Sequence, residues 1–164
     1  MTTSKPVVLA DLFDAHEASL QLLPAAWRTF GGRTAFAGPV QTLACFEDNT
    51  FVRTLLGDPG RGRVLLVEGG ASLRCALLGD QLAELAITNG WSGVVVYGAV
   101  RDAAVMRTLD LGVVALGTCP IKSVKRSSGR PGDPVQVAGV TVRTGMWLYA
   151  DEDGVAVSET SLLA

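Results

Sequence analysis

The middle of the chain alternates short apolar runs with amphipathic segments. The runs at residues 63–70, 92–98 and 113–117 are rich in valine and leucine and bounded by glycines, which is typical of strands buried on both faces. Residues 80–90 and 102–112 carry apolar positions at helical spacing, and Asn-Gly ends the first of them. The order strand, helix, strand, helix, strand predicts parallel strands joined by right-handed crossovers.

The N-terminal part has a less regular pattern. Residues 5–30 show apolar positions at mixed helical spacings and predict helices, with Pro24 as a break or a helix start. Residues 35–46 predict an extended segment, in which Gly-Pro at 38–39 suggests a bulge or an edge. Residues 47–62 then predict a short helix with a turn-rich exit.

The pattern changes again after residue 120. Residues 122–134 form a polar, basic loop. Residues 135–158 alternate apolar and polar positions, with turn residues at three points, which predicts antiparallel β structure. The sequence thus predicts a mixed α/β fold in which a β-rich layer is added to a partly parallel sheet. We expect one domain over residues 1–164, since neither an internal repeat nor a boundary is evident.

Composition narrows the class of protein. The 164 residues are 48% hydrophobic, so a packed core is expected, and the net charge of −2 argues against general nucleic-acid binding. Cys45, Cys75 and Cys119 form no CxxC pair, so we interpret them as reduced thiols in a cytoplasmic protein. The apolar start is interrupted early by an acidic residue, unlike a signal peptide, and no apolar run reaches membrane-spanning length.

Two strand–helix junctions carry the candidate chemistry. Gly79-Asp80 closes a short apolar run over residues 73–79 and opens a helix, and Arg101-Asp102 closes a strand and opens the next helix. Both junctions follow candidate parallel strands. Ligands of open α/β sheets bind at that edge. The two junctions are separated by twenty residues, and this spacing does not by itself bring them together in space.

These residue types suit a small carboxylate and a divalent metal. The backbone amides of Gln81 and Leu82 lie at a helix start, where they can hold an anion, and Arg101 can add a forked donor. Asp80 and Asp102 offer hard oxygen ligands for Mg²⁺ or Mn²⁺. Taken singly, each aspartate also fits a helix cap, and an arginine at a strand end fits a solvated charge. Matching chemistry at two junctions favours a site.

At this point the sequence resembles a known family. Asp80, twenty residues and then Arg101-Asp102 match the D-X20-R-D signature of the RraA-like proteins, which include class II 4-hydroxy-4-methyl-2-oxoglutarate aldolases and the regulator of ribonuclease E activity. The resemblance extends to "FGGRTAFAGPV", "GAVRDAAVMRTLDLGVVALGTCPIKS" and "ADEDGVAV", and so covers most of the chain. The sequence also looks close to the actinobacterial-type members of the family that were once labelled as menaquinone-related methyltransferases.

The resemblance implies a fold and a substrate site. The family has a β/β/α sandwich of the swivelling-domain kind and commonly forms homotrimers with sites at subunit interfaces. In its aldolase members, the pyruvyl part of the substrate is bound by the residues that match Gly79, Asp80, Gln81 and Leu82. The residue that matches Arg101 holds the same group.

The resemblance also implies a metal and a mechanism. The residue matching Asp102 carries the divalent cation, Mg²⁺ or Mn²⁺, and the one matching Asp80 orients a water on it. Asp80, Arg101 and Asp102 would then be the catalytic residues for cleavage of a 2-oxo acid to pyruvate enolate. Some aldolase members have a longer C-terminal segment that sends a carboxylate into the neighbouring site. Here the chain ends at "SETSLLA", where Glu159 is the remaining carboxylate that could reach a partner.

Other motifs carry less chemistry. "VLLVEGGASL" faintly resembles a methyltransferase loop but lacks its further glycine, so a tight turn is the simpler interpretation. His16, the only histidine, fits a surface or packing role. The basic residues after residue 120 fit either a solvated loop or a docking surface for an acidic partner; they are Lys122, Lys125, Arg126 and Arg130.

Two functional hypotheses follow. The first is a metal-dependent lyase that cleaves 4-hydroxy-4-methyl-2-oxoglutarate or decarboxylates oxaloacetate. The second is a non-catalytic regulator that binds ribonuclease E. Taken together, the two hypotheses give as expected partners a small 2-oxo acid for the lyase, ribonuclease E for the regulator and copies of the same chain in a homotrimer, without direct nucleic-acid or membrane binding.

Overall fold

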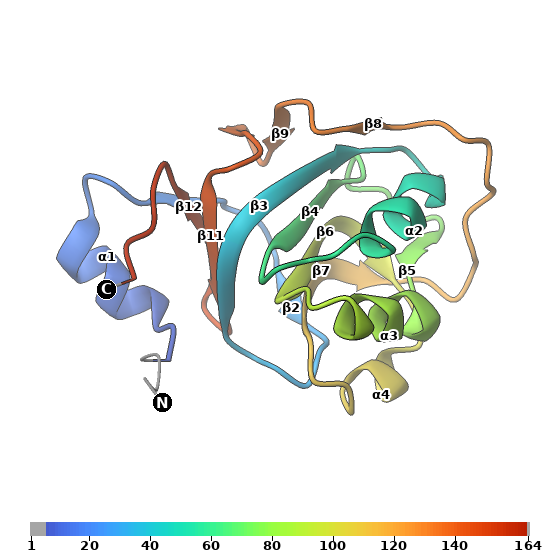
Figure 1. Cartoon of the computed structure of the whole chain (residues 1–164), viewed down its shortest axis with the longest axis horizontal. Helices are drawn as coiled ribbons and strands as arrows, with labels where there is room; N and C mark the ends of the chain where they lie inside the picture. The colour runs from blue at the N-terminus through green and yellow to red at the C-terminus, as the bar shows by residue number, and fades with distance from the viewer. Residues whose placement is uncertain (1–5, 164) are drawn as a thin grey trace.

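Two β-layers and one layer of helices make up the main body of the fold, and the N-terminal helix packs separately on the second β-layer (Figure 1). The structure is a computed structural model that describes residues 6–163. The helices are α1 (Leu9–His16), α2 (Thr50–Leu56), α3 (Asp80–Thr88) and α4 (Ala103–Met106). The strands are β1 (Gln21–Leu22), β2 (Arg28–Thr29), β3 (Phe36–Ala44), β4 (Val64–Glu68), β5 (Ala76–Leu78), β6 (Gly93–Val100), β7 (Gly112–Thr118), β8 (Arg130–Pro131), β9 (Val135–Val137), β10 (Val140–Val142), β11 (Trp147–Asp151) and β12 (Gly154–Ser158).

The central layer is a parallel sheet in the order β3, β4, β6, β7, with β5 beside the end of β6. Both of its faces are covered, which explains the continuous apolar runs. In β4, Leu65 and Val67 belong to the core under the helices, and Val64 and Leu66 belong to the core under the second β-layer. Alternate side chains of a strand point to opposite faces, so a doubly buried strand must be apolar throughout.

The second β-layer branches from β3. Residues 36–39 of β3 pair with β11 in antiparallel register, and residues 40–44 pair with β4 in parallel register. The Gly-Pro pair at 38–39 thus marks the point where one strand passes between two sheets, and β3 is central where an edge or a bulge had been expected. A Cβ on Gly38 would lie 2.2 Å from the carbonyl oxygen of Gly62, so this close crossing requires glycine.

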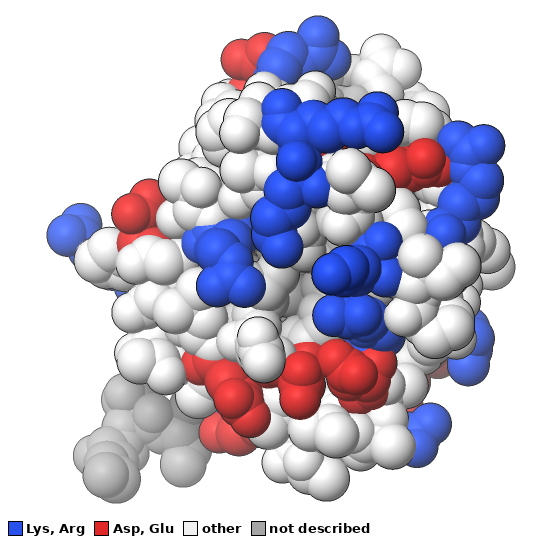
Figure 2. Space-filling view, turned by 90° about the vertical axis from the view of Figure 1, so that its right-hand side faces the viewer, with Lys and Arg blue, Asp and Glu red and all other residues white. Residues whose placement is uncertain are grey.

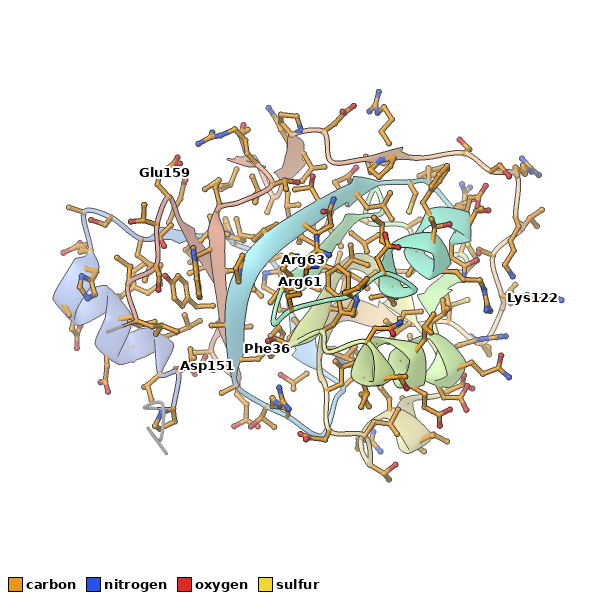
Figure 3. The ribbon with its side chains drawn as sticks, viewed as in Figure 1. Phe36, Arg61, Arg63, Lys122, Asp151 and Glu159 are labelled. Atoms are coloured by element: carbon orange, nitrogen blue, oxygen red, sulfur yellow. The ribbon has the colours of Figure 1, made fainter. Side chains whose placement is uncertain are left out.

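Phe36 fixes the packing of this layer on the parallel sheet (Figure 3). Its ring lies over Gly93 and Gly112, the first residues of β6 and β7. A Cβ on Gly93 would lie 2.4 Å from the ring, and one on Gly112 would lie 2.1 Å from it. The two glycines therefore create the space that the aromatic side chain fills.

Helices α2, α3 and α4 cover the other face of the parallel sheet (Figure 1). Helix α1 packs on β11 and β12, where Leu9 joins a small core with Tyr149 and Ala156. This arrangement confirms the predicted β/β/α sandwich with a mixed sheet. None of the helices within residues 6–163 has the length and apolar character needed to cross a membrane. The predicted domain limits of 1 and 164 lie outside the described residues.

The predicted helical character of residues 5–30 is wrong beyond residue 16; residue 5 lies outside the described range. The backbone amide of Leu23 bonds to Val155, and β1 and β2 are instead short edge strands on β12 and β7. Tertiary pairing thus overrides a weak helical spacing. The helix predicted over residues 102–112 is also too long, because α4 ends at Met106. The amides of Thr108 and Leu109 bond three residues back, and the carbonyls of Leu109 and Leu111 accept hydrogen bonds from residues 32–33.

Candidate functional site

The C-terminal ends of β5 and β6 lie side by side at one end of the parallel sheet. Leu78 pairs with Val100, and the amide of Arg101 donates a 2.9 Å hydrogen bond to the carbonyl of Leu78. The two junctions singled out in the sequence follow directly from these strand ends. The crossover through α3 therefore brings Gly79-Asp80 against Arg101-Asp102, as the topology of a parallel sheet requires.

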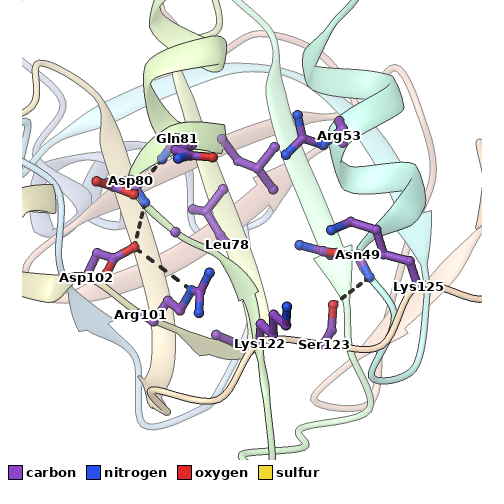
Figure 4. A pocket seen from close by; sticks show the side chains of 13 residues that line it. Asn49, Arg53, Leu78, Asp80, Gln81, Arg101, Asp102, Lys122, Ser123 and Lys125 are labelled. Atoms are coloured by element: carbon purple, nitrogen blue, oxygen red, sulfur yellow. Dashed lines mark hydrogen bonds and ion pairs between the residues drawn. The ribbon is translucent and has the colours of Figure 1, made fainter.

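The two junctions meet at the carboxylate of Asp102 (Figure 4). The amide of Asp80 donates a 3.1 Å hydrogen bond to Oδ2 of Asp102. The guanidinium Nε of Arg101 lies 4.0 Å from the same oxygen. A Cβ on Gly79 would lie 2.8 Å from it, so glycine is what lets the end of β5 approach so closely. The carboxylate of Asp102 is thus the point on which both junctions converge.

Asp102 has a backbone conformation that few L-residues adopt. Its φ is 60° and its ψ 40°, in the left-handed region, and its carbonyl accepts the first hydrogen bond of α4 from Met106. Aspartate is among the residues that tolerate this region best, although some strain remains. Such strain is concentrated at sites where a side chain has to be aimed, and here it accompanies a carboxylate aimed at the neighbouring strand end.

The start of α3 is arranged differently from the expectation for an anion site. The amide of Gln81 donates a 2.8 Å hydrogen bond to Oδ1 of Asp80. The amide of Leu82 has no acceptor within the described part of the chain. The carboxylate of Asp80 therefore already occupies one of the two amides that were predicted to hold a substrate carboxylate, and an incoming anion would have to displace it from Gln81.

A pocket of about 450 Å³ opens over these junctions. Its other walls come from the start of α2 and from the loop after β7, and they contribute Asn49, Arg53, Lys122, Ser123 and Lys125. Figure 2 shows basic side chains gathered around a hollow on this face, with a band of acidic side chains along one side. The lining brings together four cationic side chains and two carboxylates, namely Arg53, Arg101, Lys122, Lys125, Asp80 and Asp102. Such a site suits a ligand with more than one negative charge.

All six residues predicted for the site line this one pocket: Gly79, Asp80, Gln81, Leu82, Arg101 and Asp102. The sequence interpretation missed Asn49, Arg53, Lys122 and Lys125 as site residues. A signal was present, because residues 47–49 follow β3 and residues 119–125 follow β7. Ligands of open α/β sheets bind at the C-terminal ends of the strands, and this rule applies to β3 and β7 as it does to β5 and β6.

The loop after β7 is fastened to the start of α2 by Asp48. This carboxylate is 2% exposed. Its Oδ1 accepts hydrogen bonds from the amide and hydroxyl of Thr50, at 2.9 and 2.6 Å. Its Oδ2 accepts from the amides of Arg126 and Ser128, at 2.7 and 3.2 Å. Burial raises the pKa of Asp48, but these hydrogen bonds outweigh burial and lower the pKa to about 2.

Asp102 has the character of a ligand for a hard divalent cation. Its side chain is 37% exposed and faces the pocket, and carboxylate oxygen is the donor that Mg²⁺ and Mn²⁺ prefer. Within residues 6–163, no group of three or more histidine, cysteine, aspartate or glutamate side chains could hold a metal. The half-exposed carboxylate of Asp102, in a pocket open to water, fits a cation such as Mg²⁺, which keeps several waters and takes one or two carboxylates. A closed zinc site would need more protein ligands.

The other sequence candidates lie outside this chemistry. All three cysteines are free and buried. Burial, with the nearby carboxylates of Asp48 and Glu68, raises the pKa of Cys45 to about 12, which makes it a poor nucleophile. Glu68 accepts a hydrogen bond from the amide of Gly70 in a tight turn, as expected for the glycine pair. Glu159 forms an ion pair with Arg143 of its own chain, away from the labelled Lys122 (Figure 3).

Comparison with known proteins identifies similar sequences along nearly the whole chain. The model of the RraA-like family, described as Aldolase/RraA, matches residues 9–157. A protein of Aromatoleum aromaticum named "Putative 4-hydroxy-4-methyl-2-oxoglutarate aldolase" is 53% identical over 94% of this chain and 97% of its own. A protein of Alkalilimnicola ehrlichii with the same name is 54% identical over 96% of this chain and 98% of its own.

Two solved structures show the same fold. One, described as an S-adenosylmethionine:2-dimethylmenaquinone methyltransferase from Geobacillus kaustophilus, is 40% identical and covers 95% of this chain and 97% of its own, with a TM-score of 0.93. The other, described as the RNA-processing inhibitor RraA from Thermus thermophilus, is 46% identical and covers 94% of each chain, with a TM-score of 0.90.

Proposed function

This chain belongs to the RraA-like family, and from that premise and the pocket we propose that it is a divalent-metal-dependent lyase acting on 2-oxo acids. The substrates are 4-hydroxy-4-methyl-2-oxoglutarate, which would yield two pyruvates, and oxaloacetate, which would yield pyruvate and CO₂. The observation that carries the proposal is the convergence of both strand ends on the carboxylate of Asp102, beside Arg101 and the start of α3. Relatives about half identical over almost their full length carry the matching aldolase name.

The charges of the pocket fit these substrates. Both substrates are dicarboxylates with a 2-oxo group next to one carboxylate. Arg101 and the amide of Leu82 would bind the 2-oxo acid end. Arg53 and Lys125 lie across the pocket from Arg101 (Figure 4), and with Lys122 they would neutralise the second carboxylate. A neutral or singly charged ligand would leave these cations without a counter-ion.

The reaction requires stabilisation of a pyruvate enolate. A divalent cation bound at Asp102 would supply Lewis-acid chemistry to the 2-oxo group and its carboxylate. Arg101 adds positive charge where the enolate oxygen develops, and so lowers the barrier to cleavage of the bond between C3 and C4. In the aldol cleavage, Asp80 would orient a water that takes the proton of the C4 hydroxyl while the electrons of the broken bond pass to C3. Return of that proton to C3 of the enolate then gives the second pyruvate. Decarboxylation releases CO₂ from the same position and needs no base at C4.

One assay tests the proposal. Purified protein with Mg²⁺ or Mn²⁺ should release pyruvate from at least one of the two substrates, and a chelator should stop the release. Arg101→Ala and Asp102→Ala should abolish it while the protein stays folded. Wild-type rates in both variants would show that the site is misassigned, and the absence of any pyruvate from the wild-type protein would refute the lyase proposal.

A second role is favoured by a different observation. The neighbour from Thermus thermophilus, 46% identical, is described as an RNA-processing inhibitor. We propose that this chain can also bind ribonuclease E in the cytoplasm, through a face that includes the basic loop. Arg126 and Arg130 are exposed and do not line the pocket, so they are available to an acidic partner. The two roles are compatible. From the family resemblance we also propose that the chain forms a homotrimer.

A further inference from the structure

The loop of residues 122–128, which brings Lys122 and Lys125 to the pocket, has almost no secondary structure of its own. A single bridge pairs Lys122 with Ala76 on β5, where the amide of Ala76 donates a 2.7 Å hydrogen bond to the carbonyl of Ile121. The amide of Asn49 donates a 3.1 Å hydrogen bond to Oγ of Ser123. Beyond these points the segment follows no strand or helix, so its path depends on hydrogen bonds to other parts of the fold.

Asp48 supplies the fastening farther along the segment. One of its oxygens accepts from Thr50 at the start of α2, and the other accepts from Arg126 and Ser128 in the loop. The hydroxyl of Thr50 also accepts a 3.3 Å hydrogen bond from the amide of Ser127. One buried carboxylate thus joins the helix that carries Arg53 to the segment that carries Lys125.

We propose that Asp48 is a positioning residue that holds the 122–128 loop against α2, and so keeps Lys122 and Lys125 at the pocket for the second carboxylate of the substrate. The effect of Asp48 on substrate binding rests on the lyase proposal above, whereas its effect on the position of the loop is independent of that proposal. Asp48 itself is absent from the pocket lining and is buried, so it acts through the loop and touches no ligand.

An asparagine cannot replace this carboxylate, although it has the same shape. Each oxygen of Asp48 faces two donors, one pair from Thr50 and one from the loop. An amide NH₂ group placed at either position would oppose donors with donors. The variant would also lose the negative charge that strengthens all four hydrogen bonds. Asp48→Asn should therefore release either the loop or the helix start.

The test compares Asp48→Asn with Thr50→Val, which removes only the hydroxyl of Thr50 from the same set of hydrogen bonds. Thr54→Val is the matched control, because Thr54 lies one turn along α2 and its hydroxyl bonds only to the carbonyl of Thr50. Amide hydrogen exchange is measured over residues 121–130, and steady-state kinetics are measured with oxaloacetate and Mg²⁺. A double variant with Lys125→Met completes a mutant cycle.

We expect exchange at Arg126 and Ser128 to quicken about tenfold or more in Asp48→Asn, and by less in Thr50→Val. KM should rise about tenfold with kcat within about threefold, since the loss falls on binding. Adding Lys125→Met should raise KM by no more than about twofold further, because Asp48 acts through that lysine.

Unchanged exchange in Asp48→Asn, or KM effects of Asp48→Asn and Lys125→Met that simply multiply, would overturn the proposal. If Asp48→Asn does not fold, Thr50→Val gives the same two readings against Thr54→Val. If the wild-type protein releases no pyruvate, the lyase proposal fails, and hydrogen exchange alone then decides whether Asp48 holds the loop.

Discussion

The backbone amide of Asp80 donates a 3.1 Å hydrogen bond to Oδ2 of Asp102, and this contact joins two strand ends that are 22 residues apart in the sequence. The carboxylate that receives it lies beside the guanidinium of Arg101, and a Cβ on Gly79 would lie 2.8 Å from it. The position of Asp102 is therefore set by the backbone of the neighbouring junction as well as by its own. Changes that move either backbone should move the carboxylate.

Gly79→Ala should reduce pyruvate release about 10²-fold, the cost expected when a reacting geometry is displaced by about 1 Å. The added Cβ would lie 2.8 Å from Oδ2 of Asp102, and the carboxylate would have to shift. Gly117→Ala is the control, because its Cβ meets only the flexible side chain of Leu73 at 3.5 Å or more. Similar rates in both variants would contradict the importance of this close approach.

Asp102→Asn should weaken the binding of Mn²⁺ by about tenfold or more, measured by electron paramagnetic resonance in the absence of substrate. An amide oxygen is a poorer ligand than a carboxylate for a hard cation. Asp110→Asn, which changes an exposed aspartate paired with Arg33, should bind Mn²⁺ like the wild type. Equal affinity in all three proteins would place the metal elsewhere.

The parallel sheet could be predicted from the sequence, and so could the part of the site that Gly79-Asp80 and Arg101-Asp102 form. The valine-rich runs of β4, β6 and β7 report burial on both faces, and parallel pairing follows from the helices between them. The rule that ligands bind at the C-terminal ends of such strands then identifies Asp80 and Asp102. That these two residues touch required the structure, because spacing alone leaves the alignment of β5 against β6 undetermined.

The rest of the site depends on long-range contacts that leave no local pattern. Lys122 and Lys125 lie in a polar loop, and its composition fits a solvated or a docking segment equally well. What directs the loop to the pocket is Asp48, more than seventy residues earlier, through backbone amides that are the same in every residue. The edge strands β1 and β2 escaped prediction for the same reason, since pairing with β12 and β7 decides their conformation.

Lys125→Met and Arg53→Met should each raise KM for oxaloacetate about tenfold, with a smaller effect on the binding of pyruvate, which lacks the second carboxylate. Both cations lie in the pocket across from Arg101. Arg130→Met is the control, because Arg130 is exposed and lies 3.9 Å from Asp133 outside the pocket. Equal losses for both ligands would show that these cations do not distinguish the second carboxylate.

Charge reversal on the outer part of the basic loop should separate regulation from catalysis. Arg126→Glu with Arg130→Glu should weaken a pull-down of ribonuclease E, because like charges would then face an acidic partner. Pyruvate release should stay within about twofold of the wild type, since neither side chain lines the pocket. Undiminished capture by the double variant would exclude this loop as the docking surface.

The stability of the fold should depend on the ionisation of Asp48 in acid. Its pKa is lowered from 3.8 to about 2, so between these values the unfolded chain takes up a proton that the folded chain does not. The stabilisation is therefore complete above about pH 4 to 5 and is lost as pH falls towards 2, an effect of about 2 kcal/mol. Asp48→Asn has no such group, so the wild type's advantage over it in unfolding free energy should shrink by that amount between pH 6 and pH 2. Denaturant titrations at several pH values measure this difference, with Thr54→Val as a control that changes no titrating group. An advantage that stays constant down to pH 2 would mean that the four hydrogen bonds do not favour the charged carboxylate, and that the loop is held by other contacts.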